Sequence, residues 1–463
     1  MNGGTNMSKV MKWDELIKPH RVQRGNKGIQ IDLLDGGRSP FQKDQDKILF
    51  SNSFRRLGKK TQVHPLVNND HIHTRLSHSL ETASVGRSLA VKMAKKVEDV
   101  FLNNDINAKH VGEIVQAACL AHDIGNPPFG HAGEDAIKDW FKDNDNHHLI
   151  SKLDAKQQAD FKYYDGNAMG FRVLTKTEYD SFEGGMRLSF PTLAAMMKYP
   201  WSALKSEDFG KEKFSSFSSE VEMLNEVATH LGMIRKGDDW WCRHPLAYLV
   251  EAADDICYSL LDLEDAKELR IVNLKYLKRE LFDKYHDGDD EYSHIVGKRD
   301  VSDRRKLAFI RGITVDKLIE DVSNAFSNKH EEIMKGCLEG SIIEHCTEDS
   351  RELLKTAGEI CERRVYQHHR KIELEIGSYN ALGAMLSAFG LAAKELSEVK
   401  EYDELGFKSK RVVDLLGVNR PKPGTGFHEI MMRFLDYLGG MTDNFATHIS
   451  CQILGHGASS TTR

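Results

Sequence analysis

Most of the chain has apolar residues spaced as on one face of an α-helix. In 110–123 and 244–266 they recur at intervals of three and four residues, and 74–97 and 352–396 continue the pattern. Strict alternation of apolar and polar residues, typical of a half-buried strand, is almost absent. Proline is rare, at 10 of 463 residues, so few positions interrupt a helix. We therefore predict an all-α protein.

One stretch, AHDIGNPPFGHAGEDA at 121–136, interrupts the helical pattern. We expect the preceding helix to end at Gly125, because glycine commonly follows the last turn of a helix. The two prolines that follow prevent this helix from resuming. A new helix is expected to begin at Gly130 or His131.

Two pairs of ionisable residues flank this break. His122 and Asp123 fall in the last turn before it, while His131 and Glu134, three residues apart, share a face of the helix after it. Imidazole nitrogens and carboxylate oxygens are good ligands for Mg²⁺, Mn²⁺ or Zn²⁺. The break would aim both pairs at one point, where a divalent cation could bind. The simpler alternative is a capping aspartate beside a half-buried histidine.

Two further segments offer ligands of the same kind. His78 lies in a predicted helix among apolar residues. Asp254, Tyr258 and Asp262 recur every four residues and share one helical face, opposite a leucine stripe. Each has an ordinary alternative, namely a hydrogen-bonded histidine in the core or an acidic face exposed to solvent. Because several segments offer suitable ligands, a shared metal site is the stronger interpretation.

Composition and charge narrow the class of protein. With 40% hydrophobic residues the chain can bury a large core, in one large domain or two. A formal net charge of −6 gives no overall field for nucleic acid or membrane. Seven cysteines without a CxxC pair favour a reducing compartment. No apolar run approaches the ~20 residues of a membrane span, and the N-terminus lacks the apolar core of a signal peptide, so a cytoplasmic protein is expected.

Several blocks of the sequence match one family, in that family's order. They are FRRLGKKTQVHPL (54–66), HTRLSHSLETASVGR (73–87), AHDIGNPPFGHAGEDA (121–136), YDGNAMGFRVL (164–174), MMKYPW (196–201), YLVEAADDICYSLLDLEDA (248–266) and DYLGGMTDNFA (436–446). On these blocks the chain resembles the HD-domain dNTP triphosphohydrolases, of which bacterial dGTPase is the best-known member. The resemblance implies an HD-domain helical core with additional C-terminal helices. We expect an N-terminal segment at 1–44, the metal-dependent phosphohydrolase core at 45–270, and a C-terminal helical region at 271–463 that packs on the core and contributes to an oligomer interface.

The resemblance also implies roles for individual residues. One divalent metal per active site, Mg²⁺ or Mn²⁺, would be held by two histidines and two carboxylates, which leaves positions open for water and a phosphate oxygen. These implied ligands are His78, His122, Asp123 and Asp254. His131 would act as general acid toward the departing sugar oxygen, with Glu134 orienting it and favouring its protonated form. The implied substrate-binding residues are Gln62, Val63, Asn167, Lys198, Tyr199, Tyr258 and Asp262.

The implied reaction is hydrolysis of dGTP, and in some relatives of several dNTPs, to deoxynucleoside and inorganic tripolyphosphate through attack of metal-activated water on the α-phosphate. Two alternatives stay open. One is an HD phosphohydrolase that acts on another nucleotide phosphoester, and the other is a binding protein that responds to nucleotides or single-stranded DNA. The family implies a homo-oligomer, expected to be a tetramer or hexamer. No residue fixes the base preference or the need for a nucleotide activator.

Two adjacent arginines, Arg55 and Arg56, also have two interpretations. They could contact a phosphate group or form a structural ion pair. We favour the structural ion pair.

Overall fold

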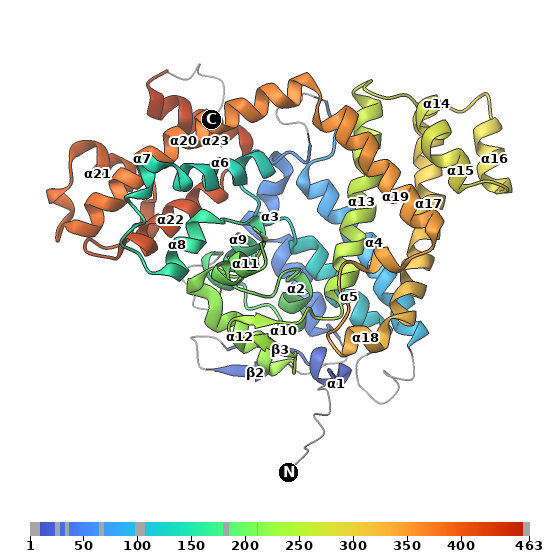
Figure 1. Ribbon diagram of the computed structural model, residues 1–463, viewed down its shortest axis with the longest axis horizontal. Helices are drawn as coiled ribbons and strands as arrows, with labels where there is room; N and C mark the ends of the chain where they lie inside the picture. Colours follow the sequence, from blue (N-terminus) through green and yellow to red (C-terminus); the bar gives the residue numbers. More distant parts are fainter. Residues whose placement is uncertain are drawn as a thin grey trace, which may run out of the picture.

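The structure is a computed structural model that describes residues 10–23, 28–32, 37–63, 69–97, 107–178, 185–210 and 212–456. Helices make up most of it (Figure 1), which confirms the prediction of an all-α protein. The strands of the described residues form two small antiparallel pairs. They are β1 (His20–Val22) with β2 (Ile29–Ile31), and β3 (Arg235–Gly237) with β4 (Trp240–Trp241). Parts of the expected N-terminal segment 1–44 lie outside the described residues.

The helices differ widely in length, and the long ones form the frame of the molecule. Those of the first half are α1 (Trp13–Leu16), α2 (Pro40–Leu49), α3 (Asn52–Arg56), α4 (Arg75–Lys96), α5 (Ala108–Ala121), α6 (His131–Lys142), α7 (Asn144–His147), α8 (Ala155–Lys162), α9 (Gly166–Arg172), α10 (Phe190–Met196), α11 (Ala203–Asp208) and α12 (Val221–His230). Those of the second half are α13 (Ala247–Glu268), α14 (Leu274–Leu277), α15 (Asp283–Tyr285), α16 (Asp290–Gly297), α17 (Asp303–Asn328), α18 (His330–Met334), α19 (Glu348–Ile360), α20 (His369–Glu398), α21 (Phe407–Asp414), α22 (Phe427–Gly439) and α23 (Asp443–Leu454).

Short 3₁₀ or π turns connect many of these helices. They are η1 (Leu57–Lys59), η3 (Val173–Thr177), η4 (Ser218–Glu220), η5 (Lys278–Phe282), η6 (Ile342–His345), η7 (Cys361–Tyr366), η8 (Tyr402–Glu404) and η9 (Gly417–Asn419).

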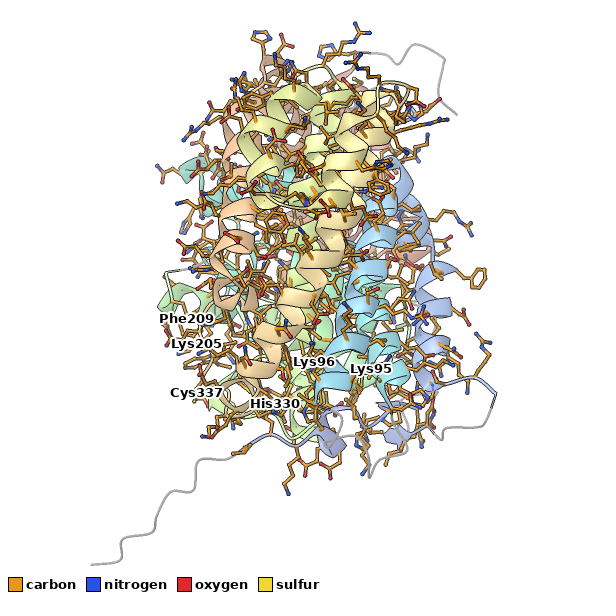
Figure 2. The ribbon with its side chains drawn as sticks, turned by 90° about the vertical axis from the view of Figure 1, so that its right-hand side faces the viewer. Lys95, Lys96, Lys205, Phe209, His330 and Cys337 are labelled. Atoms are coloured by element: carbon orange, nitrogen blue, oxygen red, sulfur yellow. The ribbon has the colours of Figure 1, made fainter. Side chains whose placement is uncertain are left out.

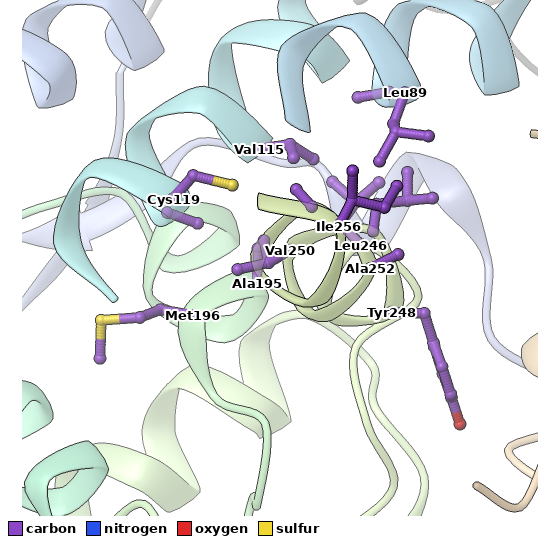
Figure 3. Close-up of a cluster of buried hydrophobic side chains, with 14 of the residues drawn as sticks. Leu89, Val115, Cys119, Ala195, Met196, Leu246, Tyr248, Val250, Ala252 and Ile256 are labelled. Atoms are coloured by element: carbon purple, nitrogen blue, oxygen red, sulfur yellow. The ribbon is translucent and has the colours of Figure 1, made fainter. Parts of the chain in front are cut away.

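The larger of two hydrophobic clusters surrounds α13. Helices α4 and α5 pack against each other and against α13, and side chains such as Leu89 and Val115 gather around Ile256 (Figure 3). An added Cβ on Gly86 would lie 2.5 Å from Sγ of Cys119, so glycine lets α4 approach α5 closely. On the other side of α4, Lys96, labelled in Figure 2, pairs with Glu320 of α17 at 2.7 Å. The frame that carries the site is therefore closely packed.

The second hydrophobic cluster joins α6, α8 and α9 to α20–α23. These elements lie to the left of α13 in Figure 1, whereas α14–α17 and α19 lie to its right. Residues of α17 and α19 belong to the cluster around α13, and residues of α20, α22 and α23 belong to the second. The residues after α13 thus pack on two different parts of the protein.

One helical segment in the described residues, Lys371–Glu398 of α20, is long and apolar enough to cross a membrane by length and composition alone. Half of its most apolar window is buried inside the protein, against neighbours that include α6, α21, α22 and α23. A core helix passes the same test, so this one segment is weak evidence for a membrane span. All seven cysteines are free thiols.

Candidate active site

The break between α5 and α6 forms a loop, residues 122–130, that we call the catalytic loop. Helix α5 ends at Ala121, and α6 begins at His131, as predicted. Phe129 and Gly130 both have positive φ, 66° and 61°, a conformation that a bulky residue such as Phe129 rarely adopts. The loop therefore turns sharply just before His131.

The prediction that the helix runs to Gly125 was wrong, because α5 ends four residues earlier. Gly125 is also not among the residues with positive φ. A Cβ on it would lie only 2.0 Å from the backbone nitrogen of Gly170 in α9. Glycine is needed here because two backbones touch, and not because a helix ends.

The four implied metal ligands come together from three parts of the chain. His78 of α4 and Asp254 of α13 approach at 2.9 Å, measured from Nε2 to Oδ1. Nε2 of His122 lies 3.4 Å from Oδ1 of Asp254 and 3.7 Å from Oδ1 of Asp123. The potential ligand atoms of His78, His122 and Asp123 all lie within 4.8 Å of one another. This cluster is compact enough for a single cation.

The chemistry of His122 fits a cation ligand. Its Nδ1 lies 2.6 Å from the carbonyl oxygen of Cys119, which fixes the proton on Nδ1 and leaves the lone pair of Nε2 directed at the cluster. Nε2 is buried and has no hydrogen-bond partner among the described residues. Burial opposes the charged form, but Asp123 and Asp254 raise the pKa of His122 to about 9. The surrounding carboxylates thus favour a positive charge at this point.

The same cluster of charges shifts the pKa of Asp254. Burial would raise its pKa, but His122 and His78 hold the pKa of this carboxyl well below its usual range. An ionised carboxylate between two imidazoles is a suitable donor set for a divalent cation.

Sequence reasoning did not single out Arg75, which is buried beside the cluster. Its Nη1 lies 2.9 Å from Oδ2 of Asp123. Arg75 is the first residue of α4, three positions before His78, so both face the same side of the helix. That spacing was a signal that could have identified it.

A cavity of about 630 Å³ opens onto the cluster. Six of the implied site residues line it, namely Gln62, Val63, Asp123, His131, Asp254 and Tyr258. The C-terminal region contributes Glu362, Tyr366, Gln367, Lys371, Leu374 and Glu375 to the same lining. A volume of this size lies in the range of small-molecule sites, roughly 300–1,000 Å³.

His131 lines this cavity and is exposed to solvent. Burial lowers its pKa from the usual value, while the charge of Glu134 works in the opposite direction. Glu134 itself is buried, accepts a hydrogen bond of 2.8 Å from the amide of Gly166, and pairs with Lys213 at 3.1 Å. In the structure Glu134 acts on His131 through its charge, while its oxygens bind these other two groups.

Asn167, Lys198 and Tyr199 lie outside the lining of the cavity, as does a fourth implied substrate residue, Asp262. Nδ2 of Asn167 donates to Oδ1 of Asp165 at 2.8 Å. Lys198 pairs with Glu251 at 3.2 Å, and its ammonium lies 5.7 Å from the centre of the Tyr199 ring. Although burial opposes it, the charge of Glu251 raises the pKa of Lys198. All three side chains have protein partners.

Asp262 is buried behind the cavity wall. Its Oδ2 accepts a hydrogen bond of 2.6 Å from the hydroxyl of Tyr366, and burial raises its pKa to about 8. The rings of Tyr366 and Tyr258 lie side by side with centroids 6.0 Å apart. Asp262 therefore reaches the cavity through Tyr366, a residue that sequence reasoning missed.

Two more missed residues hold the catalytic loop from behind. Asp443 of α23 accepts hydrogen bonds from the amide of Phe129 at 2.9 Å and from the amide and hydroxyl of Thr61 at 3.0 and 2.7 Å. Nζ of the buried Lys60 donates to the carbonyl oxygens of Asn126 and Gly439, both at 2.5 Å. Both residues lie in blocks that resemble the family, 54–66 and 436–446, but neither block indicated a role for Lys60 or Asp443.

Known proteins resemble this chain over nearly its whole length. The HD domain model matches residues 75–168. A deoxyguanosinetriphosphate triphosphohydrolase-like protein of Pseudomonas aeruginosa is 42% identical over 454 residues, which cover 97% of this chain and 100% of that protein. A Synechocystis protein of the same description is 33% identical, with 96% and 99% covered. A deoxyguanosinetriphosphate triphosphohydrolase of Klebsiella pneumoniae is 27% identical, with 88% and 92% covered.

A helical frame with a His-Asp cluster between its helices is the architecture of an HD-type, metal-dependent phosphohydrolase. Together with the full-length similarity to the Pseudomonas protein, it shows that the chain belongs to the HD-domain dNTP triphosphohydrolase family. The resemblance seen in the sequence is thereby confirmed.

Proposed function

We propose that the protein hydrolyses deoxynucleoside triphosphates, dGTP among them, to deoxynucleoside and inorganic tripolyphosphate. The observation that carries the proposal is one cavity of about 630 Å³ whose lining combines ligands of the cation cluster, His131 and the flat ring of Tyr258. This combination suits a ligand with a phosphate group at one end and a sugar and base at the other. The names of the relatives from Pseudomonas and Klebsiella support the same substrate class.

We propose His78, His122, Asp123 and Asp254 as the ligands of one divalent cation, Mg²⁺ or Mn²⁺. When bound, such a cation supplies Lewis-acid polarisation of a phosphate oxygen and lowers the pKa of water. Arg75 keeps Asp123 ionised and in place through their 2.9 Å contact.

His131 is the proposed general acid. The 5′ oxygen of a sugar is a strongly basic leaving group, so a proton must reach it as the bond to phosphorus breaks. An imidazolium in the cavity can donate that proton near neutral pH. Glu134 supports this protonated form by its charge, against the effect of burial.

The sugar is proposed to lie between Tyr258 and the segment after η1 that carries Gln62 and Val63. Tyr366, held by Asp262 at 2.6 Å, supports the Tyr258 ring from behind. A ribose 2′ hydroxyl against a ring face would lose its hydrogen bond to water, at a cost of about 1–3 kcal/mol. Ribonucleotides are therefore expected to be poor substrates.

Asn167, Lys198 and Tyr199 are proposed to help hold the triphosphate. The positive charge of Lys198 is stabilised by Glu251 at 3.2 Å, so contact with phosphate would compete with an existing ion pair.

We also propose that the protein is cytoplasmic and forms a homo-oligomer, a tetramer or a hexamer. Each chain would comprise an N-terminal segment 1–44, a core 45–270 and a C-terminal region 271–463. Turnover measured with and without a second nucleotide or single-stranded DNA tests whether either one regulates the enzyme.

The test is incubation of the purified protein with each dNTP and NTP in the presence of Mg²⁺ or Mn²⁺, followed by separation of the products. Tripolyphosphate with deoxynucleoside is the expected result. Pyrophosphate with a monophosphate would place the attack at another bond and leave His131 without its role. Hydrolysis of a different phosphoester alone would favour the alternative HD activity, and tight binding without turnover would favour a binding protein.

A further inference from the structure

A second cavity, of about 410 Å³, lies next to the catalytic loop but does not include the cation cluster. It is bordered by α3, by the residues at the end of η3, and by α22 with the turn that follows it. The charged residues in its lining are Arg56, Lys60, Glu178, Arg433 and Asp436. None of these residues has a role in the proposed reaction.

The two acidic residues of this lining are engaged elsewhere. Asp436 accepts hydrogen bonds of 2.6 and 2.8 Å from Nε and Nη2 of Arg172. Oε1 of Glu178 accepts a hydrogen bond of 2.7 Å from the amide of Asn52. Arg172 also pairs with Glu220 at 2.6 Å, and Lys176 lies 3.5 Å from the same carboxylate, so two cations balance Asp436 and Glu220. Glu178 is then the acidic residue of the lining that remains to offset Arg56 and Lys60.

Arg56 has no hydrogen bond or ion pair with any residue that the structure describes, although Glu178 attracts it at longer range. Its guanidinium lies beside Gly440, where a Cβ would be 3.6 Å from Nη2. Burial lowers the pKa of Arg56. The structural ion pair favoured from the sequence is therefore not found among the described residues.

Lys60 adds to the excess of positive charge. It is buried, and burial together with the charges of Arg56 and Arg75 lowers its pKa to about 7. An anion placed between Arg56 and Lys60 would relieve this repulsion. Guanidinium groups bind phosphate through paired, charge-assisted hydrogen bonds.

We propose that this second cavity is a binding site for a phosphate-class oxyanion, held by Arg56 and Lys60 with the help of Arg433. Occupation of the site would also act on the catalytic loop, because Lys60 lines this cavity and donates to the carbonyl of Asn126. An anion that holds Lys60 in its charged form strengthens that contact. Binding itself is independent of the proposed reaction, and only an effect on turnover would rest on the proposed function.

The first experiment is isothermal titration calorimetry of the full chain with inorganic phosphate and, separately, with a deoxynucleoside monophosphate. Arg56→Gln is expected to weaken binding of one of them about tenfold or more, since a charged hydrogen-bond donor is lost. Arg55→Gln, a change in the exposed neighbouring arginine, is the matched control and should bind as the unchanged protein does. Whichever probe depends on Arg56 identifies the source of the phosphate group.

The proposal is overturned if neither probe binds, or if Arg56→Gln and Arg55→Gln bind both probes equally well. Thermal denaturation without anion checks that Arg56→Gln is folded. If it is not, Asn419→Asp adds a negative charge at the exposed rim of the same cavity and should weaken binding by a similar factor. Unchanged affinity in that variant would also overturn the proposal.

Hydrogen exchange tests the link to the catalytic loop without any turnover. The bound anion should slow exchange in a peptide that covers 121–136 in the unchanged protein and in Arg55→Gln, but not in Arg56→Gln. Anion bound only in the catalytic cavity would protect this peptide in all three proteins, and that result would contradict the link through Lys60.

Discussion

Asp123 combines two roles at the scale of a single residue, because it faces His122 and also binds Arg75. We expect Asp123→Asn to keep the fold and to lose tight metal binding and nearly all activity, since a neutral amide is a much poorer ligand for a divalent cation. Elemental analysis of the purified variant measures the metal. Asp145→Asn, a change in an exposed acid of α7, is the control and should retain metal. Stoichiometric metal in Asp123→Asn would contradict the assignment.

His131 is expected to matter for turnover and not for metal content. His131→Ala should lower kcat by ~10²–10⁴, the usual share of a general acid. Glu134→Gln should lower kcat by less than His131→Ala does. It should also change the pH profile of kcat, because the charge of Glu134 raises the pKa of His131. A general acid must be protonated, so activity falls as pH rises past its pKa, and this fall should occur at lower pH in Glu134→Gln. An unchanged profile of kcat against pH in that variant would speak against His131 as the acid.

At the scale of elements, Asp443 links α23 to both walls of the cavity. In Asp443→Asn an amide NH₂ replaces one acceptor and would face the N–H of Phe129 or Thr61. We expect kcat to fall on the order of 10–100-fold, as for a small misplacement of reacting groups, with a smaller change in KM and intact metal content. Asn444→Ala, an exposed neighbour, is the control. A lower melting temperature with unchanged kcat per folded molecule would indicate a structural role only.

His244 joins α1 to the start of α13 and makes their packing sensitive to pH. Its Nε2 lies 3.0 Å from the carbonyl oxygen of Leu16, and its Nδ1 accepts from the amide of Leu246 at 3.2 Å, so only the neutral ring fits. Burial lowers its pKa from 6.5 to about 4. The pKa of His244 is lower in the folded protein than in the unfolded protein. The contribution of the neutral, buried His244 ring to folding stability is therefore complete above pH 6.5 and is lost as the pH falls toward 4.

The free energy of unfolding contributed by His244 should be about 2 kcal/mol lower at pH 5 than at pH 7. Urea unfolding at pH 7 and pH 5 measures it. His244→Asn should flatten the difference between the two pH values, while the exposed His148→Asn should not. Equal pH dependence in both variants would contradict the role of His244.

The sequence allowed prediction of the helices and of the break because both depend on local patterns. The start of a new helix at His131 could be predicted because prolines and glycines lie just before it. The contact of Gly125 with Gly170 could not be predicted, since periodicity does not say which turns of two helices meet. For the same reason the role of Asp443 could not be predicted, because it binds Phe129 although the two residues lie 314 positions apart in the sequence.

At the scale of the whole molecule, we expect a homo-oligomer, as the family resemblance implies. Phe50, Ile376 and Phe407 are exposed at 74%, 62% and 78% and are candidates for contacts between chains. Light scattering should give a mass four or six times the 52.5 kDa of one chain. A mass near that of one chain under active conditions would contradict the expected oligomer.

The bond between Asp443 and Phe129 also has a consequence for biosynthesis. A ribosome releases the catalytic loop long before it adds Asp443, 314 residues later. Until α23 is made and docks, the amides of Phe129 and Thr61 lack their acceptor, and the turn before His131 lacks its support. Under the proposed function, a nascent chain can present the cation ligands but does not yet hold the general acid in place. On that proposal, full hydrolytic activity is expected only after translation has passed α23.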